Sequence, residues 1–108
     1  MNEESALTAL GSISNQTRLR ILKALVAAGA DGMTAGDIAE AVAASPSRAS
    51  FHLTQLSDAG LINSTRHARQ IIYAVDFDSI GALVRYLIED CCQNNATVRS
   101  CCGVGRAC

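Results

Sequence analysis

The strongest constraint on the fold is a pair of helix-start signals that lie one short helix apart. Thr34 is followed three residues later by Asp37, which is a capping-box pattern. Ser45 is a favoured N-cap residue, and the Pro46 that follows it suits the first helical position. The second helix is expected to run from Pro46 to Gly60, because glycine favours helix termination. Two short helices joined by a tight turn predict a helix-turn-helix.

Apolar periodicity predicts helices on both sides of this pair. A short amphipathic helix is expected over residues 4–12, and a longer one over residues 15–28. The longer helix carries apolar residues at helical spacing: Leu19, Ile21, Leu22, Leu25 and Val26. Arg18, Arg20 and Lys23 lie toward its other side.

Residues 61–75 change from helical to strand-like character. Polar residues follow Leu61-Ile62, a turn is expected at His67-Ala68, and residues 71–75 are β-branched and aromatic. Two strands around a basic turn form a hairpin, which we call the wing. The predicted fold class is therefore mainly α with a β-hairpin wing, a winged helix-turn-helix of five helices and two strands.

The fifth helix is expected to begin after Asp76. Its apolar residues recur at alternating steps of three and four: Phe77, Ile80, Val84, Leu87 and Cys91. This spacing is typical of a helix that packs against another helix. The chain beyond it is polar and carries glycine and cysteine, so we expect a folded domain over residues 1–92 and a flexible tail over residues 93–108.

Length and composition indicate one soluble domain. The 108 residues suffice for one modest core, and no apolar run approaches the roughly 18 residues of a membrane span. The N-terminus, Met1-Asn2-Glu3-Glu4, is acidic and lacks the apolar core of a signal peptide. We therefore expect a cytoplasmic protein that does not contact membranes.

Charge is distributed unevenly along the chain. Residues 45–75 carry three arginines against one acid, whereas the flanking segments are net negative. A nucleic-acid interface needs local positive charge, and a basic total is not required. The predicted helix from Pro46 presents polar side chains of kinds that read base edges in the major groove, and Phe51 beside them suits a thymine methyl. The candidate contact residues on this predicted helix are therefore Ser47, Arg48, Ser50, Phe51 and Thr54.

Three further residues complete the candidate DNA contacts. Arg66 and Arg69 at the wing suit phosphate or minor-groove contacts, or are ordinary surface charges. His52 lies at the edge of the apolar stripe, where the residues alone favour a structural histidine.

Two segments resemble the ArsR/SmtB family of metal-responsive repressors. One is Ser12-Ile13-Ser14-Asn15-Gln16-Thr17-Arg18-Leu19-Arg20-Ile21-Leu22; the other runs from Ser45 through His52-Leu53 to Asp58-Ala59-Gly60-Leu61-Ile62. The resemblance implies a homodimer formed by the first and last helices, and an inverted-repeat operator in double-stranded DNA. It also implies that Ser47, Arg48, Ser50 and His52 lie in or near the DNA contact set.

The metal sites familiar in this family are not present in their usual form. Many of its arsenic and heavy-metal sensors have a Cys-x-Cys near the start of the first helix of the helix-turn-helix, where this chain has Gly36-Asp37-Ile38-Ala39-Glu40. A zinc site on the last helix would use Asp76 and Asp78, but that helix has no histidine.

All five cysteines lie within the last 18 residues, at positions 91, 92, 101, 102 and 108. This clustering does not suit a disulfide-stapled secreted fold, and it favours reduced thiols. Thiolates select soft ions. We expect Cys91, Cys92 and either Cys101 or Cys102 to capture trivalent arsenic, as arsenite or methylarsenite, or antimonite, with zinc less favoured. Some family members are similar, with a vicinal cysteine pair at the end of the last helix and a further tail cysteine.

These observations predict a homodimeric repressor that is released from its operator by a thiophilic ion. Cadmium, lead and mercury are other candidate ions. Cys91 also continues the apolar spacing of its helix, so it could instead be a buried residue of the dimer interface. A thiol-disulfide switch between the pair and the tail, without metalloid binding, is the alternative. A non-DNA interaction module or metallochaperone on the same fold is another. No Gly-rich phosphate loop, Ser/His/Asp arrangement or paired-carboxylate pocket points to an enzyme.

Overall fold

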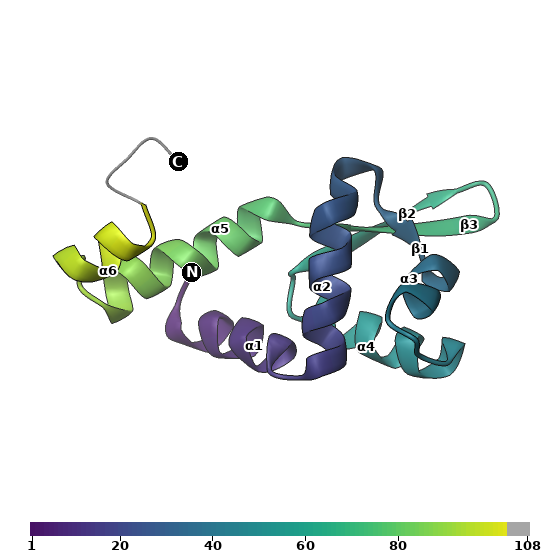
Figure 1. Ribbon diagram of the computed structural model, residues 1–108, viewed down its shortest axis with the longest axis horizontal. Coiled ribbons are helices and arrows are strands. Elements are labelled where there is room, and N and C mark those ends of the chain that lie inside the picture. Colours follow the sequence, from purple (N-terminus) through teal and green to yellow (C-terminus); the bar gives the residue numbers. More distant parts are fainter. Residues whose placement is uncertain (104–108) are drawn as a thin grey trace.

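The computed structural model describes residues 1–103. Its elements follow one another in this order (Figure 1): α1 (Glu3–Ile13), α2 (Gln16–Ala28), the 3-10 turn η1 (Gly29–Asp31), β1 (Met33–Thr34), α3 (Ala35–Ala41), α4 (Pro46–Asp58), β2 (Ile62–His67), β3 (Gln70–Val75), α5 (Phe77–Arg85), the π-helical segment η2 (Tyr86–Cys91) and α6 (Ala96–Cys101). The predicted class, mainly α with a wing, is confirmed.

The helix-turn-helix is formed by α3 and α4, and the two predicted N-caps begin these helices. The Thr34 hydroxyl accepts a hydrogen bond from the Asp37 N–H at 3.1 Å, and the Ser45 hydroxyl accepts one from the Arg48 N–H at 3.3 Å. Each cap satisfies an N–H group that has no partner within its helix. Between the helices the chain turns at Ala43, which adopts a φ of 54°.

The wing belongs to a three-stranded antiparallel sheet of order β1-β3-β2 within residues 1–103. Strands β2 and β3 pair from Ile62 with Val75 to His67 with Gln70, so the tight turn contains Ala68 and Arg69. The prediction of two strands was incomplete, because β1 adds a third through Met33 opposite Tyr73. A strand of two residues is too short to show the alternation from which strands are predicted.

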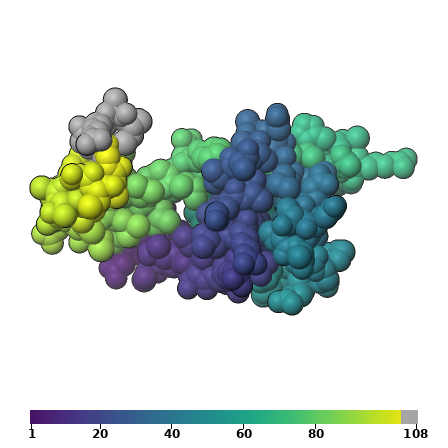
Figure 2. Space-filling view, viewed as in Figure 1, coloured from purple at the N-terminus to yellow at the C-terminus, as the bar shows by residue number. Residues whose placement is uncertain are grey.

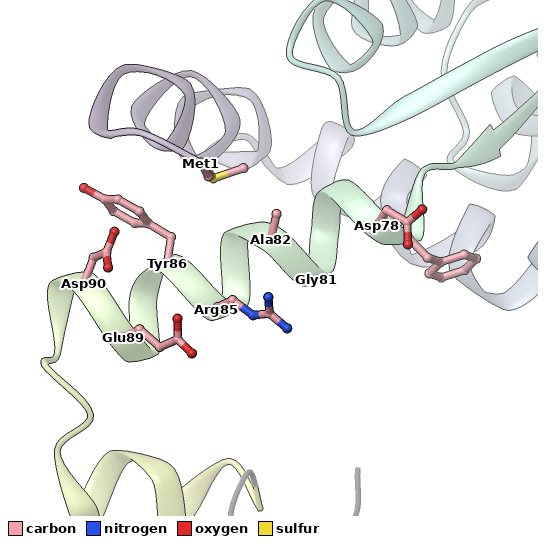
Figure 3. A pocket seen from close by; sticks show the side chains of 9 residues that line it. Met1, Asp78, Gly81, Ala82, Arg85, Tyr86, Glu89 and Asp90 are labelled. Atoms are coloured by element: carbon pink, nitrogen blue, oxygen red, sulfur yellow. The ribbon is translucent and has the colours of Figure 1, made fainter.

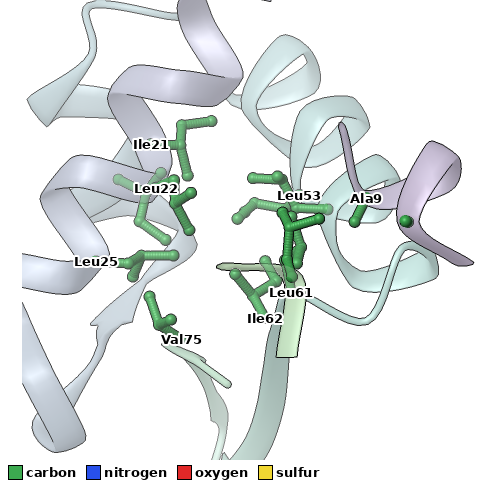
Figure 4. Close-up of a cluster of buried hydrophobic side chains, with 12 residues drawn as sticks. Ala9, Ile21, Leu22, Leu25, Leu53, Leu61, Ile62 and Val75 are labelled. Atoms are coloured by element: carbon green, nitrogen blue, oxygen red, sulfur yellow. The ribbon is translucent and has the colours of Figure 1, made fainter. Parts of the chain in front are cut away.

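The core lies where α1, α2, α4 and the base of the sheet meet (Figure 4). Its largest fully buried side chains are Ile21, Leu25, Ile38, Leu53, Leu56 and Leu61. Each such side chain stabilises the fold by about 1.5–3 kcal/mol relative to exposure. The buried stripe of α4 includes Ala49, Leu53 and Leu56, which fixes the polar face of this helix outward.

The apolar stripe of α2 is narrower than predicted. Ile21, Leu22 and Leu25 are buried, whereas Leu19 and Val26 are 46% and 47% exposed. The neighbours of α2 are α1, α3, α4 and β3, and its contacts with them leave these two residues uncovered.

The C-terminal part also differs from the sequence prediction. The expected single helix after Asp76 changes to π-helical winding at Tyr86, and the expected flexible tail contains α6, capped by the Asn95 side chain. Figures 1 and 2 show η2 and α6 at the end of the long axis opposite the wing. The molecule extends 47 Å along this axis.

Candidate nucleic-acid interface and thiol cluster

The outward face of α4 presents the side chains that the sequence assigned to DNA. Ser47, Arg48, Ser50, Phe51 and Thr54 are all exposed, and Phe51 keeps 58% of its surface in contact with solvent. Burial is the default for phenylalanine, so a ring exposed to this degree leaves apolar surface available for contact with a ligand. A shallow groove of about 270 Å³ runs along this face between Ser47, Arg48, Phe51 and His52.

His52 differs from the other residues of this set because it is only 7% exposed. Its Nδ1 lies 3.1 Å from Nη1 of Arg18, which also donates from Nε to the Ser12 carbonyl at the end of α1. Its ring packs edge-on against Phe51, with 5.5 Å between ring centroids. Arg18 therefore connects α1 to α4 through two hydrogen bonds.

The surroundings of His52 favour its neutral form. Burial lowers the pKa of the His52 imidazole, and the positive charges of Arg18 and Arg48 lower it further. The sequence prediction missed Arg18 as a site residue, because its place on the polar side of α2 gives no sign of a contact 34 positions along the chain.

The two predicted wing arginines are exposed. Arg66 lies on β2 opposite Ile71, and Arg69 lies in the hairpin turn. Figure 1 shows the wing and the helix-turn-helix at the same end of the molecule, away from α6. The polar face of α4 and the two wing cations can therefore act on one extended ligand.

The candidate metal ligands lie at the other end. Cys91, Cys101 and Cys102 are exposed and Cys92 is half-buried, all as free thiols. The π-helical winding of η2 directs the Cys92 N–H to the Leu87 carbonyl, five residues back, at 2.9 Å. This looser winding reduces the rotation between adjacent residues below the 100° of an α-helix. Cys108 lies outside the described residues.

The Cys92 thiol interacts with two of its sulfur neighbours. Partial burial raises the pKa of the Cys92 thiol, and the charge of a Cys91 thiolate, a hydrogen bond with Cys91 and the charge of a Cys102 thiolate raise it further. Within residues 1–103, however, no three His, Cys, Asp or Glu side chains meet in an arrangement that could hold a metal ion. Cys91 and Cys102 thus influence Cys92 electrostatically, but the predicted ligands do not form a ready site within residues 1–103.

Within residues 1–103, Asp76 and Asp78, the carboxylates considered for zinc, do not form a metal site either. The Asp76 side chain caps α5, accepting a hydrogen bond from the Ser79 N–H at 3.1 Å. In the described part of the chain, no helix is both long and apolar enough to cross a membrane.

Comparison with known proteins places the chain among transcriptional regulators. A helix-turn-helix domain model matches residues 13–65. The chain is 34% identical over 84 residues to the HTH-type transcriptional regulator YgaV of Escherichia coli (strain K12), a match that covers 78% of this chain and 83% of that protein.

Solved structures show the same fold. An ArsR-like transcriptional regulator from Rhodococcus sp. RHA1 superposes with a TM-score of 0.74 at 20% identity, covering 97% of this chain and 96% of that one. A homodimeric winged helix-turn-helix DNA-binding domain from Mycobacterium bovis, described as a possible ArsR-family regulator, gives 0.63 at 20% identity, covering 81% and 84%. Together with the exposed polar face of α4, the match to YgaV identifies a regulator and not an enzyme: the chain belongs to the helix-turn-helix transcriptional regulators and has the fold of ArsR-like winged helix-turn-helix proteins.

Proposed function

We propose that this protein is a cytoplasmic homodimeric repressor that binds an inverted-repeat operator and releases it when its C-terminal thiols capture trivalent arsenic. The observation that carries the DNA-binding part is the outward face of α4, where Ser47, Arg48, Ser50, Phe51 and Thr54 stand exposed above a buried apolar stripe. The hydroxyl groups suit base edges in the major groove, Phe51 suits a thymine methyl, and the Arg48 guanidinium suits a base edge or a phosphate. Arg66 and Arg69 of the wing contact the flanking backbone.

Dimerisation is supported by apolar side chains that one protomer leaves uncovered. Leu7 on α1 is 62% exposed, and Phe77 and Val84 on α5 are 50% and 45% exposed. Phe77 and Val84 belong to the seam whose spacing predicts packing against another helix. Covering such residues is favourable, and a second copy presents the same residues to them.

A groove of about 450 Å³ lies along α5 and the start of η2 beside this seam, and Figure 3 shows Met1 across from it, where Ala82 of α5 and Tyr86 of η2 project. It suits the corresponding helix of a partner subunit. A two-fold dimer of this kind presents two copies of α4, which is why we expect an inverted repeat with half-sites about one helical turn apart.

The chemistry of the donor set fits a thiophilic ion. Sulfur ligands select soft ions, and Cys91 and Cys102 are the thiols that act electrostatically on Cys92. Because these thiols do not form a ready three-sulfur site, we propose that α6 moves to bring Cys102, or Cys101 beside it, onto the vicinal pair. Bound arsenite, methylarsenite or antimonite would supply the bonds to sulfur that hold α6 there.

The thiols follow directly on α5 and η2, the proposed dimer helix. Ordering of α6 against η2 can therefore change how the two protomers are tilted and how far apart their α4 helices lie. Release requires that the ion-bound state binds DNA more weakly than the free state does.

The alternative, a disulfide switch without an ion, would use the same thiols. Oxidation and ion capture both proceed through the thiolate, so the raised pKa of the Cys92 thiol disfavours both reactions and does not separate them. The vicinal arrangement of Cys91 and Cys92 also suits two bonds to one ion.

The test is DNA binding by the purified, fully reduced protein, followed by fluorescence anisotropy on a duplex selected from random sequences. We expect arsenite to release the duplex from the wild-type protein, and Cys92→Ser and the double variant Cys101→Ser/Cys102→Ser to retain it. Zinc is expected to have a smaller effect. If arsenite, methylarsenite, antimonite and cadmium all leave the wild-type protein bound, the proposed sensing function is wrong.

The dimer is tested separately by light scattering of the protein in solution. Val84→Glu on α5 is expected to yield monomers, and Ile71→Glu, which places the same charge on an exposed apolar residue of the wing, is the matched control. A dimeric Val84→Glu variant would exclude α5 as the interface.

A further inference from the structure

The hydrogen bond between Arg18 and His52 determines which ring nitrogen of His52 carries the proton. Arginine has donors only, so the Nδ1 that lies 3.1 Å from Arg18 Nη1 must accept. The neutral ring therefore carries its proton on Nε2. Among residues 1–103, Nε2 has no hydrogen-bond partner.

The Nε2–H group nevertheless reaches solvent. No side-chain N or O atom that is buried from solvent lacks a partner in the described part of the chain, so Nε2 must be accessible. The opening available to it is the groove along α4, which His52 lines together with Ser47, Arg48 and Phe51. A nine-tenths buried ring therefore presents a single donor to the surface that faces the DNA.

The polar groups at this groove suit an anion. The Arg48 guanidinium is a cation, the Ser47 hydroxyl donates, and Arg18 adds a second positive charge behind the ring. Among residues 1–103, Arg18 has no ion pair, because its contacts are the Ser12 carbonyl and the His52 ring. Two cations and two neutral donors without a carboxylate in the groove lining match the ligands that proteins use for DNA phosphates.

We propose that this groove holds a phosphate of the DNA backbone, with His52 donating its Nε2–H to the phosphate and Arg18 acting as the positioning residue that fixes the His52 tautomer. The inference rests on the proposed docking of α4 and adds separate roles for the residues of this helix. His52 places the helix on the backbone, and its exposed neighbours Ser50, Phe51 and Thr54 face the bases.

The tautomer is tested first, in the protein alone. Long-range ¹H–¹⁵N spectra of the folded protein are expected to show the Nε2–H form for His52, with His67 at the wing turn as an internal reference. Arg18→Gln should give a mixture of tautomers, because an amide does not force Nδ1 to accept. Arg20→Gln removes an exposed charge from the same helix and should leave the tautomer unchanged. An Nδ1–H tautomer in the wild-type protein would overturn the proposal.

The phosphate contact is tested by comparing selected and random duplexes. His52→Asn keeps an acceptor near the Nδ1 position and removes the outer donor, whereas His52→Gln keeps a donor near Nε2. His52→Asn is expected to weaken binding to both duplexes by the same factor, about tenfold for the hydrogen bond to the phosphate. His52→Gln should recover much of the affinity. Weakening confined to the selected duplex would mean that His52 reads a base and does not hold a phosphate.

Salt dependence separates His52 from Arg48. A neutral donor releases no counterion, so His52→Asn should leave the slope of log affinity against log salt unchanged, whereas Arg48→Ala should reduce it by about 0.9 for each phosphate that Arg48 neutralises. A reduced slope in His52→Asn would contradict a neutral contact.

The pH profile adds a readout that a purely structural role would not change. The charged groups that face His52 are Arg18 from α2 and Arg48 from α4 itself. In Arg18→Gln, one of these cations is removed, so the imidazolium forms at higher pH and should bind the phosphate more tightly than the neutral ring. DNA binding by Arg18→Gln should therefore strengthen on acidification at a higher pH than in the wild-type protein. Identical pH profiles would overturn the role of Arg18. Failure of the wild-type protein to bind any duplex would instead refute the proposed function.

Discussion

Two glycines that follow α2 allow the cost of a side chain pressed against β3 to be measured separately from the cost of backbone strain. Gly29 and Gly32 have nearly the same backbone conformation, with φ, ψ of 65°, −144° and 67°, −166°. A Cβ atom at Gly29 would meet no atom within 4 Å, whereas a Cβ atom at Gly32 would overlap the Tyr73 carbonyl oxygen and lie 2.8 Å from Cγ2 of Ile72. Alanine at either site has the same unfavourable φ, but only alanine at Gly32 collides with β3.

The two substitutions should therefore differ in magnitude. Gly29→Ala is expected to destabilise the fold by about 2 kcal/mol, the usual range for a side chain in this glycine region being about 1–3 kcal/mol. Gly32→Ala adds the displacement of β1 from β3, where Met33 pairs with Tyr73 and Thr34 with Ile72. If each of these two residue pairs loses about 1 kcal/mol of hydrogen bonding, and the strain costs about 2 kcal/mol as at Gly29, Gly32→Ala lowers the free energy of unfolding by about 4 kcal/mol. That is a large part of the 5–15 kcal/mol typical of a domain.

Urea unfolding followed by circular dichroism measures the difference. With slopes of about 1–3 kcal/mol/M, the midpoint of Gly32→Ala should lie roughly 1 M below that of Gly29→Ala. Equal midpoints would show that β1 does not depend on the close approach of Gly32 to Tyr73.

Three further changes have defined outcomes. Leu56→Ala removes a fully buried side chain and should lower the free energy of unfolding by about 2–5 kcal/mol. Leu7 is 62% exposed, so Leu7→Ala should change the free energy of unfolding of the monomeric Val84→Glu variant by less than about 0.5 kcal/mol. Chemical denaturation measures both changes. Acidification should destabilise the protein through His52, because the pKa of this imidazole is lower in the folded state and the unfolded chain binds the proton more readily. The contribution of His52 to stability is present above about pH 6.5 and is lost as the pH falls toward the folded pKa. Melting curves recorded at decreasing pH should show this loss in the wild-type protein and not in His52→Asn. Capture of arsenite should release no net proton near neutral pH, because As(OH)3 gives up one hydroxyl as water for each thiol proton that leaves, whereas capture of cadmium must release the Cys92 proton and should strengthen as the pH rises. Calorimetry in buffers of different ionisation enthalpy counts the protons, and a pH-independent cadmium affinity would argue against Cys92 as a ligand.

The parts of the fold that were predictable are those specified by local chemistry. Thr34, Ser45 and Pro46 begin their helices through side-chain caps and a fixed φ, so their positions could be read from sequence. The parts that were not predictable depend on contacts between distant segments. Strand β1 forms because β3 supplies its pairing partners. The π-helical winding that begins at Tyr86 could not be predicted, because the apolar spacing of this segment fits an α-helix equally well.

The candidate site divides in the same way. The exposed face of α4 followed from helical periodicity, because the buried stripe of Ala49, Leu53 and Leu56 leaves its opposite side to solvent. The burial of His52 and its contact with Arg18 could not be predicted, since the two residues come together through the packing of α2 on α4. The arrangement of Cys92 with Cys102 likewise depends on α6, a helix of six residues that the sequence suggested would be a flexible tail.

In the proposed function, thiol capture and DNA binding oppose one another through the dimer. Linkage requires the effect to be reciprocal, so the affinity of the protein for arsenite should be measured by calorimetry with and without the selected duplex. We predict that saturating duplex weakens arsenite binding by the same factor by which arsenite weakens DNA binding, about tenfold or more. Equal arsenite affinities for the free and DNA-bound dimers would contradict the claim.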